Sequence, residues 1–270
     1  MLAHNASTSR AIFMTNRHTE TNILEHWKKW RDKKNYGEGE NKDLAFKLMT
    51  DCFFRQTEKL KLSNLGLKTL PESLPPAIKE LDIQGNKLTQ LPDNLPLNLE
   101  KLNVSGNQLV ALQKNLPESI TCLILANNAF EEIPCHLPSK LINLDLSSNN
   151  ITAIHHQLPT EMTCLNCANN KITSVQNLPA HLELLFLMHN ELASFEATIP
   201  VSIKTINIQH NRLRTLPCEF LSIKSDDAAI FLEGNPLSTE TLETLVELET
   251  NPNGAAPQFY FSNGGERESW

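Results

Sequence analysis

The six cysteines are the residues of this chain best suited to chemistry by type. Cys164 and Cys167 form a C-x-x-C pair, a spacing that serves thiol redox chemistry or supplies two ligands of a zinc site. Cys164 also shares its repeat position with Cys122, two repeats away, but a zinc site built on that pair would need two more ligands, and no histidine is aligned to supply them. Cys167 also occupies a position that is apolar in neighbouring segments, which favours a thiol packed in the core. Six cysteines in 270 residues are too few for a disulfide scaffold.

The histidines form two groups. His136, His155 and His156 lie in proline-bearing segments, where exposed residues are the default and a metal site is the alternative. His189 and His210 occupy the same position in two consecutive copies of a sequence repeat, so they are expected to be neighbours. They could form a pH-sensitive or ligand-contacting pair, and the alternative is a pair of ordinary exposed polar residues.

The composition argues against several classes of protein. The chain has 15 Pro and only 9 Gly, and neither G-x-G-x-x-G nor G-x-x-x-x-G-K-[ST] occurs, which disfavours nucleotide folds. The net charge is −7 and the central region is acidic, so a basic face for nucleic acid is not expected. No run reaches the roughly 20 apolar residues that span a bilayer, and the start lacks the apolar core of a secretory signal peptide.

No set of side chains in the sequence converges on acid–base or nucleophilic catalysis. We therefore predict no catalytic residue, no metal ligand and no cofactor in this segment. The expected partner is a protein, with no nucleic-acid partner and no membrane span.

A repeat organises the middle of the chain. The pattern L-x-x-L-x-L-x-x-N-x-L fits seven consecutive windows, from IKELDIQGNKL (78–88) to IKTINIQHNRL (203–213), and imperfect copies begin at Leu60 and Ile230. The spacing of the first core residue is 21 in most of these nine units. This is a short leucine-rich repeat. Each L-x-L core predicts a short strand, and stacking of the units predicts an α/β solenoid with a curved parallel sheet on its concave side.

The remainder of each repeat has a predicted role too. The recurring Asn should bond backbone groups of the turn that leaves the strand. A proline-bearing return such as LPDNLPLNL (91–99) follows it. Such a return has no room for a full helix and favours an extended polyproline path, so the convex side should be poor in helix. The asparagines are Asn86, Asn107, Asn128, Asn149, Asn170, Asn190, Asn211 and Asn235.

The two ends depart from the repeat. Apolar residues have helical spacing in NILEHWKKWRD (22–32) and LAFKLMTDCFF (44–54), which predicts a helical cap over the open end of the core. After the repeats, Ser238 or Thr239 can cap a helix that reaches about Glu249, and QFYF (258–261) is a candidate strand. We divide the chain into an N-terminal segment (1–19), a helical N-terminal cap (20–58), nine repeats (59–237), a C-terminal cap (238–262) and a linker or tail (263–270).

Residues that flank the strand cores should form the binding face. Most are polar, so Ile124, Phe186 and Met188 stand out, with Leu184 beside them. Exposed aromatic and methionine side chains within a polar rim suit a protein-binding hot spot. The alternative is that the shortened seventh repeat turns Phe186 into the core. The predicted substrate-binding residues are Ile124, Asp145, Asn166, Leu184, Phe186, Met188, His189, Asn207, Gln209 and His210.

Several segments together resemble a known family. These are the Trp27 and Trp30 pair, GEGENKDLAFKLMTDC, the run-in LKLSNLGLKTLPESLPPAI, the LPxxLP returns, and GNPLSTETLETL with PQFYFSNGG. Together they resemble the IpaH/SlrP family of type III-secreted leucine-rich-repeat ubiquitin ligases of enterobacterial pathogens, over roughly residues 20 to 265. The resemblance implies a disordered secretion segment at 1–19, a repeat domain that binds a host target protein, delivery into the host cytoplasm, and a role in virulence.

The ligase chemistry of this family belongs to a separate helical domain after the repeats, which carries a nucleophilic Cys in a Cys-x-Asp motif. In this chain no Cys follows Cys218, and none of the six has Asp two positions on. We expect this segment not to be an enzyme. Its longer parent would be a ubiquitin-protein ligase, which is a transferase. The missing domain after Trp270 would also bind the ubiquitin-conjugating enzyme. A related subgroup, similar to YopM, has no ligase domain, so a ligase-free adaptor or scaffold effector is the alternative.

Overall fold

The computed structural model describes residues 21–33, 39–112, 116–155, 157–221, 223, 227–250 and 257–262. The segment 1–19, His156 and the tail 263–270 lie outside these ranges.

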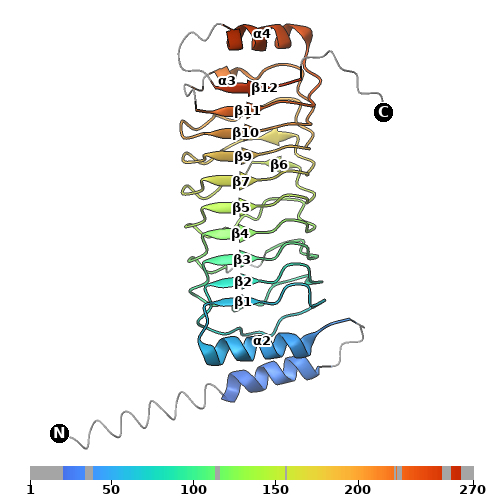
Figure 1. The fold of residues 1–270 in the computed structure, drawn as a ribbon, viewed down its shortest axis with the longest axis vertical. Coiled ribbons are helices and arrows are strands. Elements are labelled where there is room, and N and C mark those ends of the chain that lie inside the picture. Colours follow the sequence, from blue (N-terminus) through green and yellow to red (C-terminus); the bar gives the residue numbers. More distant parts are fainter. Residues whose placement is uncertain are drawn as a thin grey trace, which may run out of the picture.

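The repeats stack into one parallel sheet of ten short strands (Figure 1). All nine predicted strand centres, from Leu60 to Ile230, are the middle residues of strands. The tenth strand, β12, pairs with β11 and extends the sheet beyond the nine repeats. The strands in sheet order are β1 (Lys59–Lys61), β2 (Glu80–Asp82), β3 (Lys101–Asn103), β4 (Cys122–Ile124), β5 (Asn143–Asp145), β7 (Cys164–Asn166), β9 (Leu184–Phe186), β10 (Thr205–Asn207), β11 (Ala229–Phe231) and β12 (Gln258–Tyr260).

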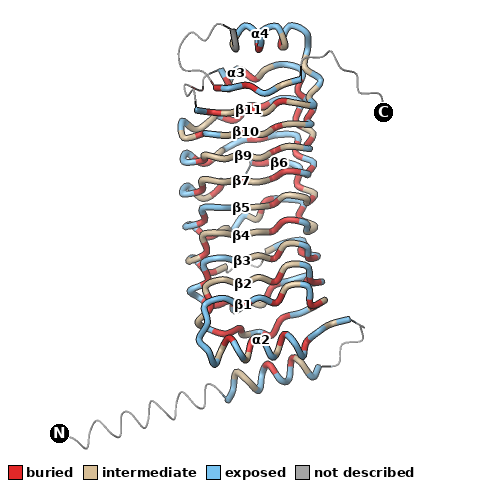
Figure 2. Tube along the Cα trace, in the orientation of Figure 1, coloured by how far each residue is buried: buried red, intermediate tan, exposed pale blue. Residues whose placement is uncertain are grey.

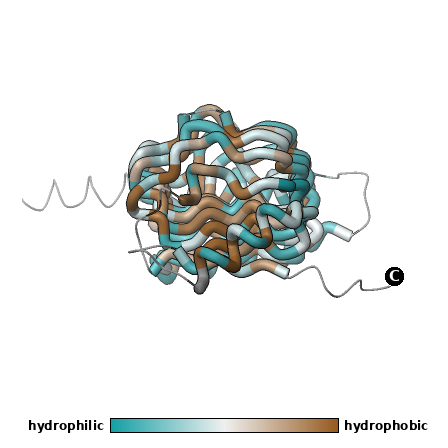
Figure 3. Tube along the Cα trace, turned by 90° about the horizontal axis from the view of Figure 1, so that it is seen from above, coloured by the Kyte–Doolittle hydropathy of each residue, from teal (hydrophilic) through white to brown (hydrophobic). Residues whose placement is uncertain are grey.

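A single hydrophobic core runs the length of the stack, from Trp27 to Phe259. The middle residue of each strand is buried and its two neighbours are exposed or half-buried, because successive side chains of a strand point to opposite faces. Buried segments therefore recur from repeat to repeat (Figure 2). Viewed along the stack, hydrophobic segments of successive repeats lie over one another (Figure 3). Because the strands pair in register, apolar residues at equivalent positions of successive repeats form continuous columns in the core.

The predicted asparagine ladder is confirmed, and Asn149 shows its geometry. Its Nδ2 donates to the carbonyl oxygens of Leu125 (3.1 Å) and Leu146 (2.9 Å), and its Oδ1 accepts from the backbone N–H of Phe130 (3.0 Å). Two of these three partners lie in the preceding repeat, so each asparagine ties two units together. The other members of the ladder make the corresponding bonds, for example Asn107.

The residue before each ladder asparagine has a left-handed backbone. Glycine serves this position in several repeats because it has no Cβ to clash. A Cβ on Gly85 would also meet the side chain of Asn64, and a Cβ on Gly234 would meet the ring of His210. The column with positive φ is Asn64, Gly85, Gly106, Asn127, Ser148, Asn169, His189, His210 and Gly234.

The returns on the other side of the solenoid contain little helix, as predicted. Their regular structure in the described ranges is α3 (Cys218–Leu221) and a two-stranded sheet of β6 (Ala153–Ile154) and β8 (Ser174–Val175). The returns are otherwise turns and extended chain.

Helices cover both ends of the stack (Figure 1). A helix over 21–32 and α2 (Lys42–Arg55) lie before β1, and the Oδ1 of Asn41 accepts from the N–H of Leu44 to cap α2. Trp27 is fully buried and donates its Nε1–H to the carbonyl oxygen of Ser73 (2.7 Å). At the other end α4 (Thr239–Thr250) begins after Ser238, whose Oγ accepts from the N–H of Thr241 (3.2 Å).

Candidate protein-binding face

The side of the solenoid that carries the ten strands is the face expected to be concave. We define its sheet face as the residues just before and just after the middle of each strand, together with the third residue after the middle. Strand register places Ile124, Asp145 and Asn166 in one row on β4, β5 and β7. The row continues through Phe186 and Asn207 on β9 and β10. Neighbouring side chains in such a row are separated by roughly the 4.8 Å strand spacing.

Phe186 lies on the sheet face and not in the core. Its neighbours Leu185 and Leu187 are both fully buried, whereas Phe186 is half-buried. The shortened seventh repeat therefore does not turn Phe186 inward, because the residue that this repeat lacks is missing from the return before β9. Leu184 and Met188 are half-buried on the same face of the same repeat.

The polar residues of the face use part of their hydrogen-bonding capacity locally. Asp145 Oδ1 accepts from the N–H of Ser147 (2.9 Å), and Asn166 Oδ1 accepts from that of Ala168 (3.1 Å). These bonds hold the turn that leaves each strand.

A longer polar chain connects β10 to β11. Asn207 Nδ2 donates to Oε1 of Gln209 (3.0 Å), and Gln209 Nε2 donates to Oε2 of Glu233 (2.6 Å). Asn207 Oδ1 also accepts from the backbone N–H of Gln209 (3.1 Å). The chain orients all three side chains across two strands.

His189 and His210 are brought together, as their shared position predicts. Their rings stack with centroids 4.4 Å apart and planes 4° apart. Both residues are exposed and lie at the edge of the sheet face, next to Met188 and Gln209 in sequence.

Residues that sequence reasoning did not select lie at the end of the same row. The rings of Phe231 and Tyr260 stack with centroids 4.6 Å apart and planes 10° apart. Tyr260 is 41% exposed, and its hydroxyl donates to Oε1 of Gln258 (2.9 Å). The sequence signal that could have found Tyr260 is the segment QFY (258–260), in which an apolar residue, Phe259, occupies the buried middle position as in the strands of the repeats.

Charge is divided unevenly along the face. On β1 to β3 the lysines pair with carboxylates across strands: Lys59 with Glu80 (2.9 Å), Lys101 with Glu80 (3.6 Å) and Lys61 with Asp82 (3.8 Å). The hydrogen bond from Lys59 lowers the pKa of Glu80.

The rest of the sheet face, from β4 to β12, is different: it carries Asp145 and Glu233 and no lysine or arginine.

The cysteines favour the packing alternative over redox or zinc chemistry. Cys167 is fully buried, and burial strongly raises the pKa of its thiol. Burial also raises the pKa of Cys164 and of Cys122, which flank Asn143 in one row of the sheet face. A raised pKa disfavours the reactive thiolate.

Cys135 contacts His136 on an exposed return (Sγ to Nδ1 2.9 Å). In the described ranges no group of three or more His, Cys, Asp or Glu side chains is placed so that it could hold a metal ion.

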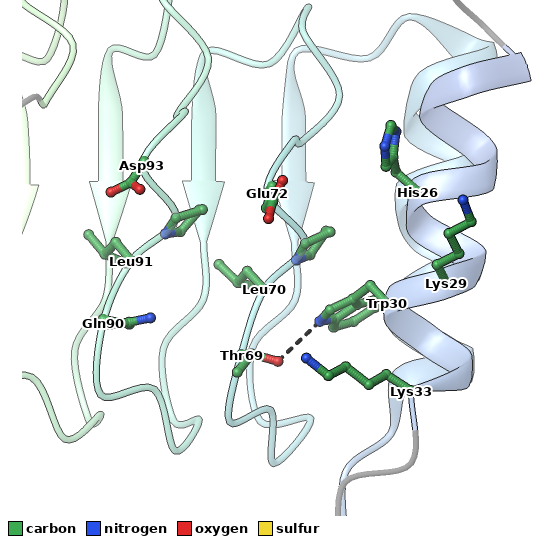
Figure 4. A pocket seen from close by; sticks show the side chains of 12 residues that line it. His26, Lys29, Trp30, Lys33, Thr69, Leu70, Glu72, Gln90, Leu91 and Asp93 are labelled. Atoms are coloured by element: carbon green, nitrogen blue, oxygen red, sulfur yellow. Dashed lines mark hydrogen bonds between the residues drawn. The ribbon is translucent and has the colours of Figure 1, made fainter.

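Cavities in the described part of the chain are lined by residues of the returns. The first, of about 500 Å³, separates the helix over 21–32 from the first two returns (Figure 4). Lys29 and Lys33 line its helix side, and Glu72 and Asp93 line its return side. The ring of Trp30 extends from the helix toward the first return and donates its Nε1–H to Oγ1 of Thr69 (3.2 Å). The second cavity, of about 550 Å³, is lined by residues between 110 and 136. Neither cavity contains a residue of the predicted binding face.

One strand of the long sheet per repeat, an asparagine ladder and capping helices define a leucine-rich-repeat domain, and the Leucine Rich Repeat family model matches residues 98–123. The chain is a leucine-rich-repeat domain related to those of the YopM and IpaH effectors. It is 35% identical to outer membrane protein YopM of Yersinia pestis over 81 residues, which are 30% of this chain and 20% of YopM. It is 37% identical to the E3 ubiquitin-protein ligase ipaH3 of Shigella flexneri over 68 residues, which are 25% of this chain and 12% of ipaH3.

Solved structures agree with this relationship. A Shigella effector leucine-rich-repeat domain superposes with a TM-score of 0.68 at 29% identity, covering 90% of this chain and 98% of that domain. YopM of Yersinia pestis superposes with a TM-score of 0.69 at 29% identity, covering 80% of this chain and 60% of that structure. The aligned sequences span a fifth or less of the two curated relatives. In the part of the chain that the structure describes, no helix is long and apolar enough to cross a membrane.

Proposed function

We propose that this chain is the substrate-recognition domain of a secreted bacterial effector ubiquitin ligase, which binds a host protein on its sheet face and directs its ubiquitination. The observation that carries the proposal is the group of apolar side chains at Ile124, Leu184, Phe186 and Met188, half-buried on a face whose other positions are mostly polar. Phenylalanine and methionine are enriched at protein interfaces relative to the rest of the protein surface.

The relationship to ipaH3, an E3 ubiquitin-protein ligase, supports the ligase part of the proposal. The six cysteines of this chain lack the Cys-x-Asp spacing. Ubiquitin transfer, and the contact with the ubiquitin-conjugating enzyme, would therefore belong to another domain of the parent protein. Secretion by a type III system and action in the host cytoplasm are part of the proposal, and a reporter fused to this chain can test delivery into host cells.

Binding on the sheet face is tested with a double variant, Phe186→Ala with Met188→Ala. Partners captured from a host-cell lysate are identified by mass spectrometry, and each is then titrated directly against the purified variants. The double variant should lose affinity by about 2 kcal/mol per residue. The matched control is Leu97→Ala with Val201→Ala, which removes apolar side chains that are 84% and 101% exposed on the returns. Equal affinity of the double variant and the wild type would reject this face as the binding site.

A ligase-free adaptor is the second candidate, because the match to YopM covers more of this chain than the match to ipaH3. The natural reading frame after Trp270 decides between them. A downstream domain with a Cys-x-Asp motif, together with ubiquitin transfer to the captured partner by the full-length protein, would support the ligase. A stop codon, or full-length protein that transfers no ubiquitin, would favour the adaptor.

A further inference from the structure

The charge on the sheet face predicts the chemistry of the partner. The lysines on β1 to β3 are paired with carboxylates, so they offer little net charge to a partner. On the strands from β4 to β12 the described sheet-face positions contain two carboxylates and no cation to neutralise them. The whole chain has a net charge of −7. The negative electrostatic potential of this face attracts a basic partner surface and repels an acidic one.

Glu233 is the carboxylate best placed to act as an anchor. It is half-buried two residues after the end of β11, and Oε2 accepts from Nε2 of Gln209 (2.6 Å). The backbone N–H of His210 donates to the carbonyl oxygen of Glu233 (2.8 Å), which fixes the turn that carries the side chain. Within the described ranges no lysine or arginine forms an ion pair with Glu233. The carboxylate is therefore oriented by the protein but not neutralised by it.

Aromatic side chains lie beside this carboxylate. Phe231 precedes Glu233 by two residues on the same side of the chain, a separation of roughly 7 Å. Its ring stacks on Tyr260, the last residue of the row. On the other side, Asn207 separates Phe231 from Phe186 in the same row. A carboxylate beside stacked rings suits a side chain with an apolar stem and a cationic head.

We propose that the sheet face of β9 to β12 binds a basic segment of a partner protein, with one arginine that pairs with Glu233 and packs its stem against Phe231 and Tyr260. Arginine fits better than lysine, because its planar guanidinium can bond a carboxylate through two N–H groups and also pack on aromatic rings. An apolar side chain of the same segment would contact Leu184, Phe186 and Met188. This inference rests on the proposed function and names the chemistry of the partner.

The experiment uses a phage-displayed library of random 12-residue peptides, selected against the whole chain. Peptides selected by the wild type should be enriched in arginine next to aromatic or aliphatic residues. Glu233→Gln keeps an oxygen that can accept from Gln209 and removes the charge, so it should bind a selected peptide about tenfold or more weakly. The matched control is Glu161→Gln, which removes one charge from an exposed return and should bind like the wild type. Circular dichroism during urea unfolding checks that each variant folds.

A charge exchange makes the test specific. Glu233→Lys should reject the selected peptide and recover binding to a peptide with glutamate in place of the arginine. Peptides no more basic than the starting library, or equal binding to the wild type and Glu233→Gln, would overturn the inference. The proposed function would survive that result if binding still required Phe186 and Met188. Peptides that bind Phe186→Ala with Met188→Ala as well as the wild type would instead overturn both.

Discussion

The imidazole ring of His189 lies flat on the ring of His210, with centroids 4.4 Å apart. The physical cause is the repeat, because residues at one position of consecutive units are separated by roughly the 4.8 Å spacing of neighbouring strands. Phe231 and Tyr260 stack at a similar separation, 4.6 Å, because they are register partners on the neighbouring strands β11 and β12. Both histidines also have left-handed backbones, with φ of 55° and 53°.

The left-handed backbone at His210 makes this position selective for residue type. We predict that His210→Asn leaves the free energy of unfolding nearly unchanged, because asparagine tolerates this conformation. His210→Val should lower it by about 1–2 kcal/mol, because the branched side chain clashes with the backbone. Urea unfolding of the two variants side by side measures the difference, and equal midpoints would contradict the prediction.

The asparagine ladder should be a major source of cohesion between repeats. Asn149→Ala leaves the buried N–H of Phe130 without its side-chain acceptor. It also removes one of the two asparagine donors to each of the carbonyl oxygens of Leu125 and Leu146. We expect a loss of about 3 kcal/mol in the free energy of unfolding. Asn150→Ala, at the adjacent half-buried residue, is the control and should change it by less than about 0.5 kcal/mol. Comparable losses for the two variants would show that the ladder does not hold the repeats together.

The cysteines should react with a thiol reagent in an order set by burial. Cys135 and Cys218 are exposed and should react first with 5,5′-dithiobis(2-nitrobenzoic acid) under native conditions. Cys122 and Cys164 should follow slowly, since burial raises the pKa of each and the thiolate is the reacting form. Cys52 and Cys167 should react only after unfolding. Peptide mapping of the labelled protein gives the order, and early labelling of Cys167 would contradict its buried position.

The N-terminal helices should stabilise the first repeats more than the last ones. Trp27→Ala removes a fully buried ring that packs edge-on against Phe53 (5.8 Å) and bonds Ser73, at a cost of about 3–5 kcal/mol. Because each repeat contacts only its neighbours, amide exchange should accelerate first in β1 and β2. Phe54→Ala, at a ring that is 61% exposed on α2, is the control. Uniform acceleration along the whole chain would argue against local capping.

Much of the fold could be predicted because it repeats. A spacing of 21 residues places Leu81, Leu102 and Leu123 at equivalent points of successive units, and equivalent points must stack in a solenoid. The strand centres, the asparagine ladder and the row from Ile124 to Asn207 all follow from that spacing. Placing a residue in the row does not, however, determine which of its neighbours it bonds.

The amino-acid sequence by itself determined the repeat, the buried middle residue of each strand, and which residues beside the strand centres are apolar. The structure decided that Phe186 lies on the sheet face and not in the core. Only the tertiary structure decided that Gln258–Tyr260 joins the sheet, that Tyr260 stacks on Phe231, and that Gln209 orients Glu233. The reason is that β12 follows α4 and lies outside the repeat period, so its register depends on how the end of the stack closes. Side-chain bonds between strands likewise depend on rotamers that the packed neighbours select.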